Sequence, residues 1–285
     1  MIMPARWYAG GKGLDEFREK TLKDTSMKLI VDFFDSTDVF PNIDLSGGVC
    51  YFLRDNNYSG DCIITTHKMG NSNTLKRPLL SIGGSFIRFN EAVSIMTKIS
   101  NDLENNFSKL VSIRKPFGIA TNDIIEQSKQ QDDIFIYAYP NNGFINQHKI
   151  TNNRDWIELY KVYISYAYGE RGDFPYFAIG KPFFGEPKTC CSETYLVINP
   201  SNESIIAENT MRYLKTKFLR FLVLLKKNTQ HATSKVYSLV PIQDFTENSD
   251  IDWSKSVSEI DQQLYKKYGL DDTEIAFIES MIKPM

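Results

Sequence analysis

The 285-residue sequence contains few residues of the kinds that bind metals or form disulfide bonds. Its three histidines, His67, His148 and His231, lie far apart, and none of its four cysteines forms a Cys-x-x-Cys pair. A zinc site would therefore have to be assembled from distant segments, and no local spacing predicts one. The adjacent Cys190 and Cys191 suit an ordinary disulfide framework poorly, which favours a reducing compartment.

The sequence also lacks a strong net charge and a long apolar run. Its 33 basic and 35 acidic residues give a net charge of −2, which excludes a histone-like or RNA-coating composition. The longest apolar stretch, Phe218 to Leu225, includes Arg220 and is much shorter than the roughly 20 residues that span a bilayer. The first residues, with Pro4 and Arg6, do not form a signal peptide. We therefore expect a cytoplasmic protein without a membrane partner.

The charges are unevenly distributed along the chain. From Gln243 onward, ten acidic residues and four lysines give a net charge of −6, so the first 242 residues carry +4 of the total of −2. A surface for nucleic acid would therefore have to be local, and the first 242 residues are the part that permits one.

Apolar and β-branched runs predict a mixed α/β fold. An apolar run that stops at Pro4 predicts the end of an edge strand, and residues 14–22 have helical spacing. Strands are expected over residues 27–34, 49–53 and 62–66, an arrangement typical of the end of an α/β sheet.

A composition rich in Asn, Ser, Pro, Gly and Lys predicts a linker over residues 67–84. We therefore divide the sequence into an incomplete α/β layer (1–66), this linker and a mixed α/β domain (85–285). In the latter, helices are expected over 90–103, 204–227, 257–268 and 272–282, and strands over 134–139, 156–167, 194–198 and 236–240.

Two sets of short segments carry a resemblance to a known family. The early set is Ile2 to Trp7, Gly13 to Arg18, and Val39 to Leu53. The later set is Tyr160 to Ile164, Gly180 to Phe183, Ser192 to Ile198, Tyr213 to Phe221, Ile251 to Trp253, and Gln263 to Tyr268. The early set resembles the late methylase motifs of adenine-specific DNA methyltransferases from restriction-modification systems, and the later set looks like the target-recognition portion of the same enzymes.

The resemblance implies the tail of a methyltransferase-type sheet followed by a target-recognition domain. The family binds S-adenosylmethionine through a glycine-rich strand-loop-helix element and holds the adenine with an Asn-Pro-Pro-aromatic motif. The nearest strings, Asn199 to Ser201 and Asp173 to Tyr176, each depart at a required proline, and Gly10 to Gly13 lacks the spacing of a phosphate loop. We therefore expect this chain alone to bind no cofactor and to be inactive.

The implied function is DNA target recognition within a bacterial N6-adenine methyltransferase that uses S-adenosylmethionine as a complete enzyme. The expected partners are double-stranded DNA and either the missing methylase half or a restriction subunit. The alternatives are a free-standing specificity subunit and part of a restriction endonuclease. For the latter, Asp173, Glu186 and Lys188 imitate a nuclease metal site only loosely, and Pro187 is awkward on a strand.

The family places an aromatic side chain against the extruded adenine, and the matching strand here makes Phe52 and Tyr51 the base-stacking candidates. Because side chains alternate along a strand, one of these neighbours must face the core instead.

The phosphate-binding candidates lie on a loop and on the long helix. In residues 112–121, Arg114 and Lys115 stand beside Pro116 and Gly118, a mixture that suits either a close approach to phosphate or an exposed turn. The other candidates are Thr121 on this loop, Lys181 with Arg171 and Lys188 in a glycine-rich stretch, and Lys217 and Arg220 on the helix. The basic residues around that helix could equally form an ordinary solvated face.

Overall fold

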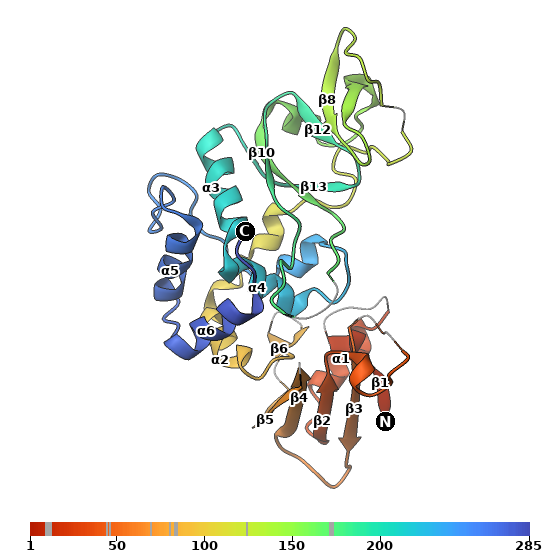
Figure 1. Cartoon of the computed structure of the whole chain (residues 1–285), viewed down its shortest axis with the longest axis vertical. Helices are drawn as coiled ribbons and strands as arrows, with labels where there is room; N and C mark the ends of the chain where they lie inside the picture. The colour runs from red at the N-terminus through yellow and green to blue at the C-terminus, as the bar shows by residue number, and fades with distance from the viewer. Residues whose placement is uncertain are drawn as a thin grey trace.

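The computed structural model confirms the predicted mixed α/β fold class. It describes residues 1–8, 13–43, 45, 47–68, 70–79, 81, 82, 85–123, 125–170 and 174–285. The described chain forms three regions in a row: an N-terminal sheet, a central group of helices and a β-rich end that contains β8 and β12 (Figure 1). The glycines and lysine of residues 9–12 lie outside the described residues.

The N-terminal sheet has five strands in the order β1-β3-β2-β4-β5. These are β1 (Ile2–Pro4), β3 (Val49–Arg54), β2 (Met27–Phe33), β4 (Cys62–Lys68) and β5 (Asn71–Arg77). Strand β3 is antiparallel to both β1 and β2, and β2 is parallel to β4. Strands β1, β2 and β4 therefore point the same way, so their carboxyl ends meet at one edge of the sheet.

Helix α1 (Asp15–Leu22) and the 3-10 turn η1 (Ala5–Tyr8) build the core of this region with the sheet. The predicted helix and strands of the first 66 residues are confirmed. One expectation needs correction, because strand β5 lies within the segment predicted to be a linker. Its mostly polar residues are those of a solvated edge strand paired antiparallel with β4, and composition alone does not distinguish such a strand from a linker.

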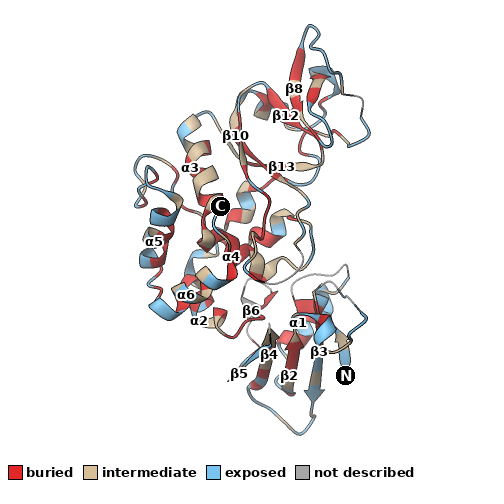
Figure 2. Cartoon of the chain, viewed as in Figure 1, coloured by how far each residue is buried: buried red, intermediate tan, exposed pale blue. Residues whose placement is uncertain are grey.

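Five helices form the central region and its large apolar core. These are α2 (Ala92–Ile99), α3 (Ser204–Lys215), α4 (Lys217–Lys226), α5 (Val257–Lys267) and α6 (Asp272–Met281). Buried residues gather where these helices face one another (Figure 2). The helix starts at 257 and 272 are fixed by capping boxes, with Ser256 and Asp271 as the capping residues.

The long helix predicted over residues 204–227 is two helices that break at Thr216. The backbone of Thr216 is extended (φ −64°, ψ 147°), and its hydroxyl donates to the carbonyl of Tyr213 and accepts from the N–H of Leu219. One residue thus ends α3 and caps α4. The apolar stripe continues across the break, which is why periodicity did not reveal it.

The strand predicted over residues 236–240 is wrong. Its first two residues belong to the 3-10 helix η7 (Ser234–Tyr237), and residues 238–240 form turns and a bend. Tyr237, Leu239 and Val240 are fully buried in the helical core. Packing against helices overrides the β-propensity of the sequence here.

The β-rich end contains two three-stranded sheets. The first has the order β11-β10-β13, with β11 (Phe183–Gly185), β10 (Tyr160–Ser165) and β13 (Tyr195–Ser201), and the second has the order β12-β8-β9, with β12 (Thr189–Cys191), β8 (Asp133–Tyr137) and β9 (Gly143–Asn146). Val162 and Ile164 enter the helical core, whereas Tyr163 between them enters a separate core of the β-rich end. Alternation along β10 thus joins two cores through one sheet.

Short elements complete the described chain. They are β6 (Ser81–Ile82), β7 (Ser85–Phe86), η2 (Ser36–Asp38), η3 (Ser100–Asp102), η4 (Phe107–Leu110), η5 (Gln147–Lys149) and η6 (Arg154–Glu158). Among the described residues, no helix is both long and apolar enough to cross a bilayer.

Gly48 permits a close approach of backbone segments before β3. Its φ is +77°, and a Cβ there would lie 2.1 Å from the carbonyl oxygen of Phe33 and 2.8 Å from Nη2 of Arg88. We expect Gly48→Ala to lower the free energy of unfolding by about 1–3 kcal/mol more than Gly269→Ala does. Gly269 is the control because it also has a positive φ, +62°, but nothing within 4 Å of its Cβ position. Equal losses for the two variants in urea unfolding would show that the approach at Gly48 is not limiting.

Candidate functional site

A cleft of about 1130 Å³ lies at the edge of the N-terminal sheet where the carboxyl ends of three parallel strands meet. Arg6 follows β1, residues 34–38 follow β2, and Lys68 ends β4. The carboxyl edge of a sheet that contains parallel strands is the usual place for a ligand in open α/β folds. The position of this cleft makes it the candidate site.

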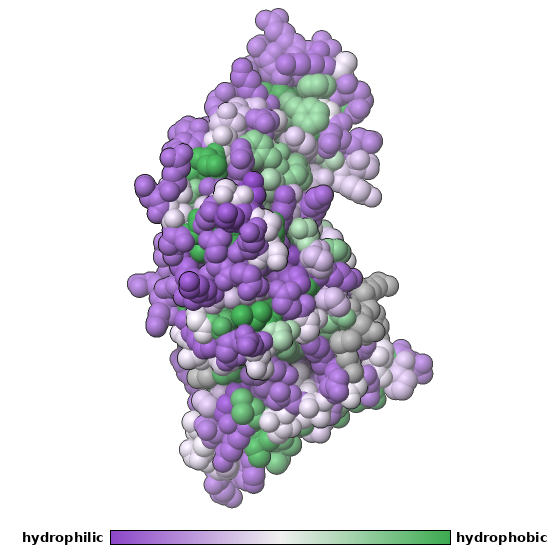
Figure 3. Space-filling model, turned by 60° about the vertical axis from the view of Figure 1, so that its left-hand side comes forward, coloured by the Kyte–Doolittle hydropathy of each residue, from purple (hydrophilic) through white to green (hydrophobic). Residues whose placement is uncertain are grey.

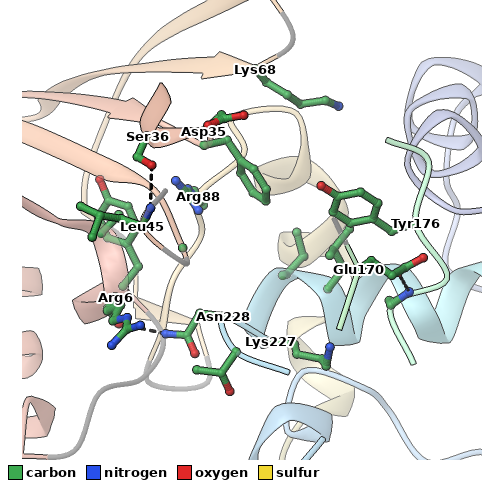
Figure 4. A pocket seen from close by; sticks show the side chains of 18 of the residues that line it. Arg6, Asp35, Ser36, Leu45, Lys68, Arg88, Glu170, Tyr176, Lys227 and Asn228 are labelled. Atoms are coloured by element: carbon green, nitrogen blue, oxygen red, sulfur yellow. Dashed lines mark hydrogen bonds between the residues drawn. The ribbon is translucent and has the colours of Figure 1, made fainter. Parts of the chain in front are cut away.

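The opposite wall of the cleft comes from the central helical region, so the site lies between two regions of the chain (Figure 4). Its described lining residues there belong to the loop after β10 and to the end of α4 with the segment that follows it: Gly169, Glu170, Phe174, Tyr176, Ala178, Leu224, Leu225, Lys227, Asn228, Thr229, Gln230 and His231. The side-chain amide of Asn228 donates to the carbonyl of Arg6 at 2.9 Å, which links the two walls directly.

An ion pair between Asp32 and Arg88 lies beneath the cleft. The guanidinium of Arg88 contacts both carboxylate oxygens of Asp32, with Nη2 2.9 Å from Oδ1, and also donates to the carbonyl of Phe33. Asp32 is fully buried and Arg88 is 9% exposed. Burial raises the pKa of Asp32, and the guanidinium opposes this effect. Removal of one partner from such a pair typically costs about 3–5 kcal/mol, because the other charge stays buried.

Aromatic rings connect this ion pair to the far wall. The Arg88 guanidinium lies 4.2 Å from the ring centroid of Phe34, whose ring packs on Phe89 and on Phe174 at 5.4 and 5.1 Å. Lys68 Nζ lies between the rings of Phe89, Phe174 and Phe277, at 5.7, 4.6 and 5.2 Å from their centroids. These cation–π contacts hold the sheet against the helical region.

Two carboxylates of the cleft accept hydrogen bonds from neighbouring groups of the protein. Asp35 accepts from the backbone and the hydroxyl of Thr37, and Glu170 accepts from the backbone N–H groups of Phe177 and Ala178. A nucleoside cofactor needs a carboxylate with free oxygens for its ribose hydroxyls and a glycine-rich turn that leads from a strand into a helix. Both hydrogen bonds of Asp35 end on Oδ1, so its carboxylate does not decide the question, whereas Gly47 in the lining precedes a strand and not a helix and so does not form the required turn.

The structure brings together Arg114, Lys115 and Thr121, three of the residues predicted to bind DNA, around one carboxylate. Glu193 Oε2 lies 3.0 Å from Arg114 Nη2 and 3.7 Å from Lys115 Nζ, and Oε1 accepts from the backbone N–H and the hydroxyl of Thr121, both at 3.1 Å. The hydrogen bonds from Thr121 and the nearby cations lower the pKa of Glu193. No local sequence pattern predicts this contact, because Glu193 lies 72 positions from Thr121 in the chain.

Backbone contacts fix this loop to the β-rich end. Ser112 exchanges two hydrogen bonds with Val197 of β13, and the N–H of Glu193 donates to the carbonyl of Ile119. Gly118, also a predicted site residue, has a φ of +81°, and a Cβ there would lie 1.9 Å from Oγ1 of Thr151. Its glycine is thus required for packing within the protein.

Two ring contacts connect the loop to the cleft. The Arg114 guanidinium lies 5.1 Å from the ring centroid of Tyr166, and that ring stacks at 5.0 Å on His231, which lines the cleft. Lys227, also in the lining, donates to the carbonyl of Tyr168, and burial lowers its pKa to about 8. In the space-filling view, the molecular surface is indented between the β-rich end and the N-terminal region (Figure 3).

The two base-stacking candidates lie on opposite faces of β3. Phe52 packs against the core of the N-terminal region, whereas Tyr51 is 38% exposed, with its ring 6.2 Å from that of Phe33. The alternation expected from the sequence is confirmed. Neither residue belongs to the described lining of the cleft.

The two candidates on the predicted long helix are engaged inside the protein. Arg220 is fully buried and donates to the carbonyls of Lys215 and Thr216, so it caps the end of α3. This placement replaces the phosphate contact expected from the sequence with a structural role. Lys217 forms an ion pair with Glu279 and has a side chain only 18% exposed.

The remaining candidates are dispersed. Lys181, Glu186 and Lys188 are exposed, whereas Arg171 and Asp173 lie outside the described residues. Within the described ranges, no group of three or more His, Cys, Asp or Glu residues could hold a metal ion. The nuclease alternative therefore gains no support from the described residues.

Comparison of this sequence with known proteins finds methylases, as the sequence motifs predict. Residues 1–40 match the family described as Eco57I restriction-modification methylase. An uncharacterized adenine-specific methylase of Mycoplasma pneumoniae (strain ATCC 29342 / M129 / Subtype 1) is 33% identical over 116 residues, which cover 40% of this chain and 27% of that protein. The chain thus spans about a quarter of the length of this relative. The resemblance to adenine-specific methylases of restriction-modification systems is confirmed.

Two solved structures are similar to this chain. The type IIL restriction-modification enzyme MmeI, determined in complex with DNA, matches with a TM-score of 0.50 and 11% identity over 97% of this chain and 48% of its own. At this identity the likeness establishes a shared fold. The type IIG restriction endonuclease BpuSI matches with a TM-score of 0.38 and 12% identity over 91% of this chain and 41% of its own, and this lower score supports no conclusion.

Asp261 makes the stability of the helical region depend on pH. Its carboxylate accepts from the backbone N–H groups of Lys217 and Phe218 at the start of α4, and burial raises its pKa to about 6 from 3.8. The folded state therefore keeps this proton up to about pH 6, and the stabilisation that it supplies is lost as the pH rises through that value. Between pH 4 and pH 7 we expect the wild type to lose about 2 kcal/mol relative to Asp261→Asn, because the unfolded carboxyl is already partly ionised at pH 4.

The measurement is urea unfolding of both proteins across this pH range. The comparison with the variant removes the contribution of the other carboxylates, of which Asp24 and Glu193, for example, have lowered pKa values and act in the opposite direction. Parallel pH profiles for the two proteins would show that Asp261 does not titrate in this window.

Proposed function

We propose that this chain recognises and positions double-stranded DNA within an N6-adenine methyltransferase of a bacterial restriction-modification system. The observation that carries the proposal is the chain of contacts from Arg114 through Tyr166 and His231 to the cleft. It joins a cationic loop, which suits phosphates, to the carboxyl edge of a sheet whose first residues match the methylase family. The DNA complex of the similar MmeI is consistent with this role.

In this proposal, phosphate contacts fix the orientation of the duplex and loop residues read it. Arg114, Lys115 and Lys181 are exposed cations suited to phosphates, and Thr121 is exposed on the same loop. Of the two stacking candidates, Tyr51 presents the more accessible ring, so we propose it as the residue that contacts an extruded base.

We further propose the division of labour predicted from the sequence. The first 66 residues would belong to the catalytic domain and residues 85–285 to the recognition domain. S-adenosylmethionine would be bound in the complete enzyme by the glycine-rich element and the Asn-Pro-Pro-aromatic motif, which this sequence lacks. The partner would be the polypeptide that carries those motifs, in the bacterial cytoplasm where the DNA is found.

The isolated chain should not bind the methyl donor. Titration calorimetry with S-adenosylmethionine should show no heat of micromolar binding, because this sequence lacks both the glycine-rich element and the Asn-Pro-Pro-aromatic motif. A complete adenine methylase that contains both motifs serves as the positive control. A micromolar dissociation constant for the isolated chain would contradict the proposed division.

Replacement of the two loop cations should weaken DNA binding independently of sequence. Each phosphate contact contributes a slope of about −0.9 to log affinity against log salt concentration, so Arg114→Ala/Lys115→Ala should reduce the slope by about two. Fluorescence anisotropy with several labelled duplexes should show an equal loss of affinity for all of them.

The matched control removes two lysines from the far side of the molecule. Lys255 and Lys266 are exposed near the two ends of α5, away from the loop (Figure 1). Their replacement by Ala changes the net charge by the same amount, so the slope should stay close to the wild-type value. If both double variants behave alike, the loop does not contact phosphates.

A further inference from the structure

The contacts around Glu193 have the chemistry of an anion-binding site. Two cations, Arg114 and Lys115, approach one carboxylate oxygen, and a backbone N–H and a hydroxyl of Thr121 approach the other. Convergent guanidinium, ammonium, N–H and O–H donors are the groups that bind phosphate in other proteins. In this chain, a side chain of the protein itself occupies the site.

The exposure of the partners shows which contacts can be exchanged. The side chain of Glu193 is 12% exposed, whereas those of Arg114 and Lys115 are 55% and 46% exposed. The two cations can therefore turn toward solvent without unfolding the loop. Thr121 can meanwhile keep its hydrogen bonds to Oε1 of Glu193, because the cations use the other oxygen.

The surroundings direct the released cations toward the cleft. Arg114 already lies against the ring of Tyr166, which stacks on His231 in the lining. The cluster has a net charge of +1 while Glu193 is ionised, since two cations face one carboxylate. Its attraction for a polyanion is therefore about half of what the two cations could provide.

We propose that Glu193 is an internal competitor for a phosphodiester at this site: its carboxylate occupies the place of a DNA phosphate until the duplex displaces it from Arg114 and Lys115. The inference rests on the proposed function and adds a residue that limits the electrostatic, sequence-independent part of binding. A protein that must select one target benefits from weak attachment elsewhere, because non-specific sites compete in large excess.

The test replaces the charge while keeping the shape. Glu193→Gln retains an oxygen for Thr121 and raises the net charge of the cluster to +2. Its affinity for labelled non-specific duplex DNA should increase about three- to tenfold, as expected when two half-exposed ion pairs no longer need to be broken. The salt dependence should steepen by about 0.9, the contribution of one phosphate. Glu193→Asp keeps the net charge of +1, so its slope against log salt concentration should stay close to the wild-type value.

Two further variants isolate the interaction. Glu158→Gln removes the same charge from an exposed position outside the cluster and should change the affinity by less than twofold. In Arg114→Ala/Lys115→Ala/Glu193→Gln, the gain in DNA affinity should disappear, because the two cations that Glu193 neutralises are absent. Circular dichroism and melting temperatures confirm that each variant is folded.

The outcomes separate the inference from the proposed function. If the wild type and Glu193→Gln both fail to bind any duplex, the proposed function is wrong and the inference falls with it. If the wild type binds and Glu193→Gln binds equally or more weakly, the function stands and the competitor is refuted. A gain that survives in the triple variant, or a slope that steepens equally in Glu193→Asp, would likewise overturn the inference.

Discussion

The buried ion pair between Asp32 and Arg88 is the constraint on which the rest of the site depends. A carboxylate without exposure to solvent at the end of β2 needs a paired cation, and Arg88 supplies it with a contact to each oxygen. The guanidinium reaches this position because Gly48 leaves room beside the carbonyl of Phe33. The pair thus fixes the backbone where the chain leaves the N-terminal sheet for the central helices.

Aromatic contacts connect this ion pair to the opposite wall of the cleft. Arg88 lies on Phe34, and the rings of Phe89 and Phe174 continue the contact to the far wall, where they also surround Lys68. Because cations and rings pack tightly here, the cleft beside them keeps defined walls. The cleft is therefore formed at the interface between the N-terminal sheet and the central helical region.

Charge in this protein is arranged locally, in agreement with the small net charge. Arg220 caps the end of α3, and burial lowers its pKa to about 10. Lys217 of α4 forms an ion pair with Glu279 of α6. Both basic side chains therefore make contacts within the protein. The cations that remain near the cleft are few, and Glu193 partly neutralises two of them. Binding of DNA would then depend on a few well-placed contacts, since a large basic surface is not present among the described residues.

The sequence by itself determined the α/β class, most of the helices and strands, and the resemblance to methylases, because these depend on local periodicity and on short motifs. Only the tertiary structure decided which polar residues serve the core. The apolar run over residues 27–34 is interrupted by Asp32, which was a visible signal of a buried charge, but its partner lies 56 positions away. In the same way, Arg114 meets Glu193 only through the packing of distant segments. The start of α4 after the break at Thr216 also binds Asp261, which lies 44 positions from Lys217 and which no local pattern specifies.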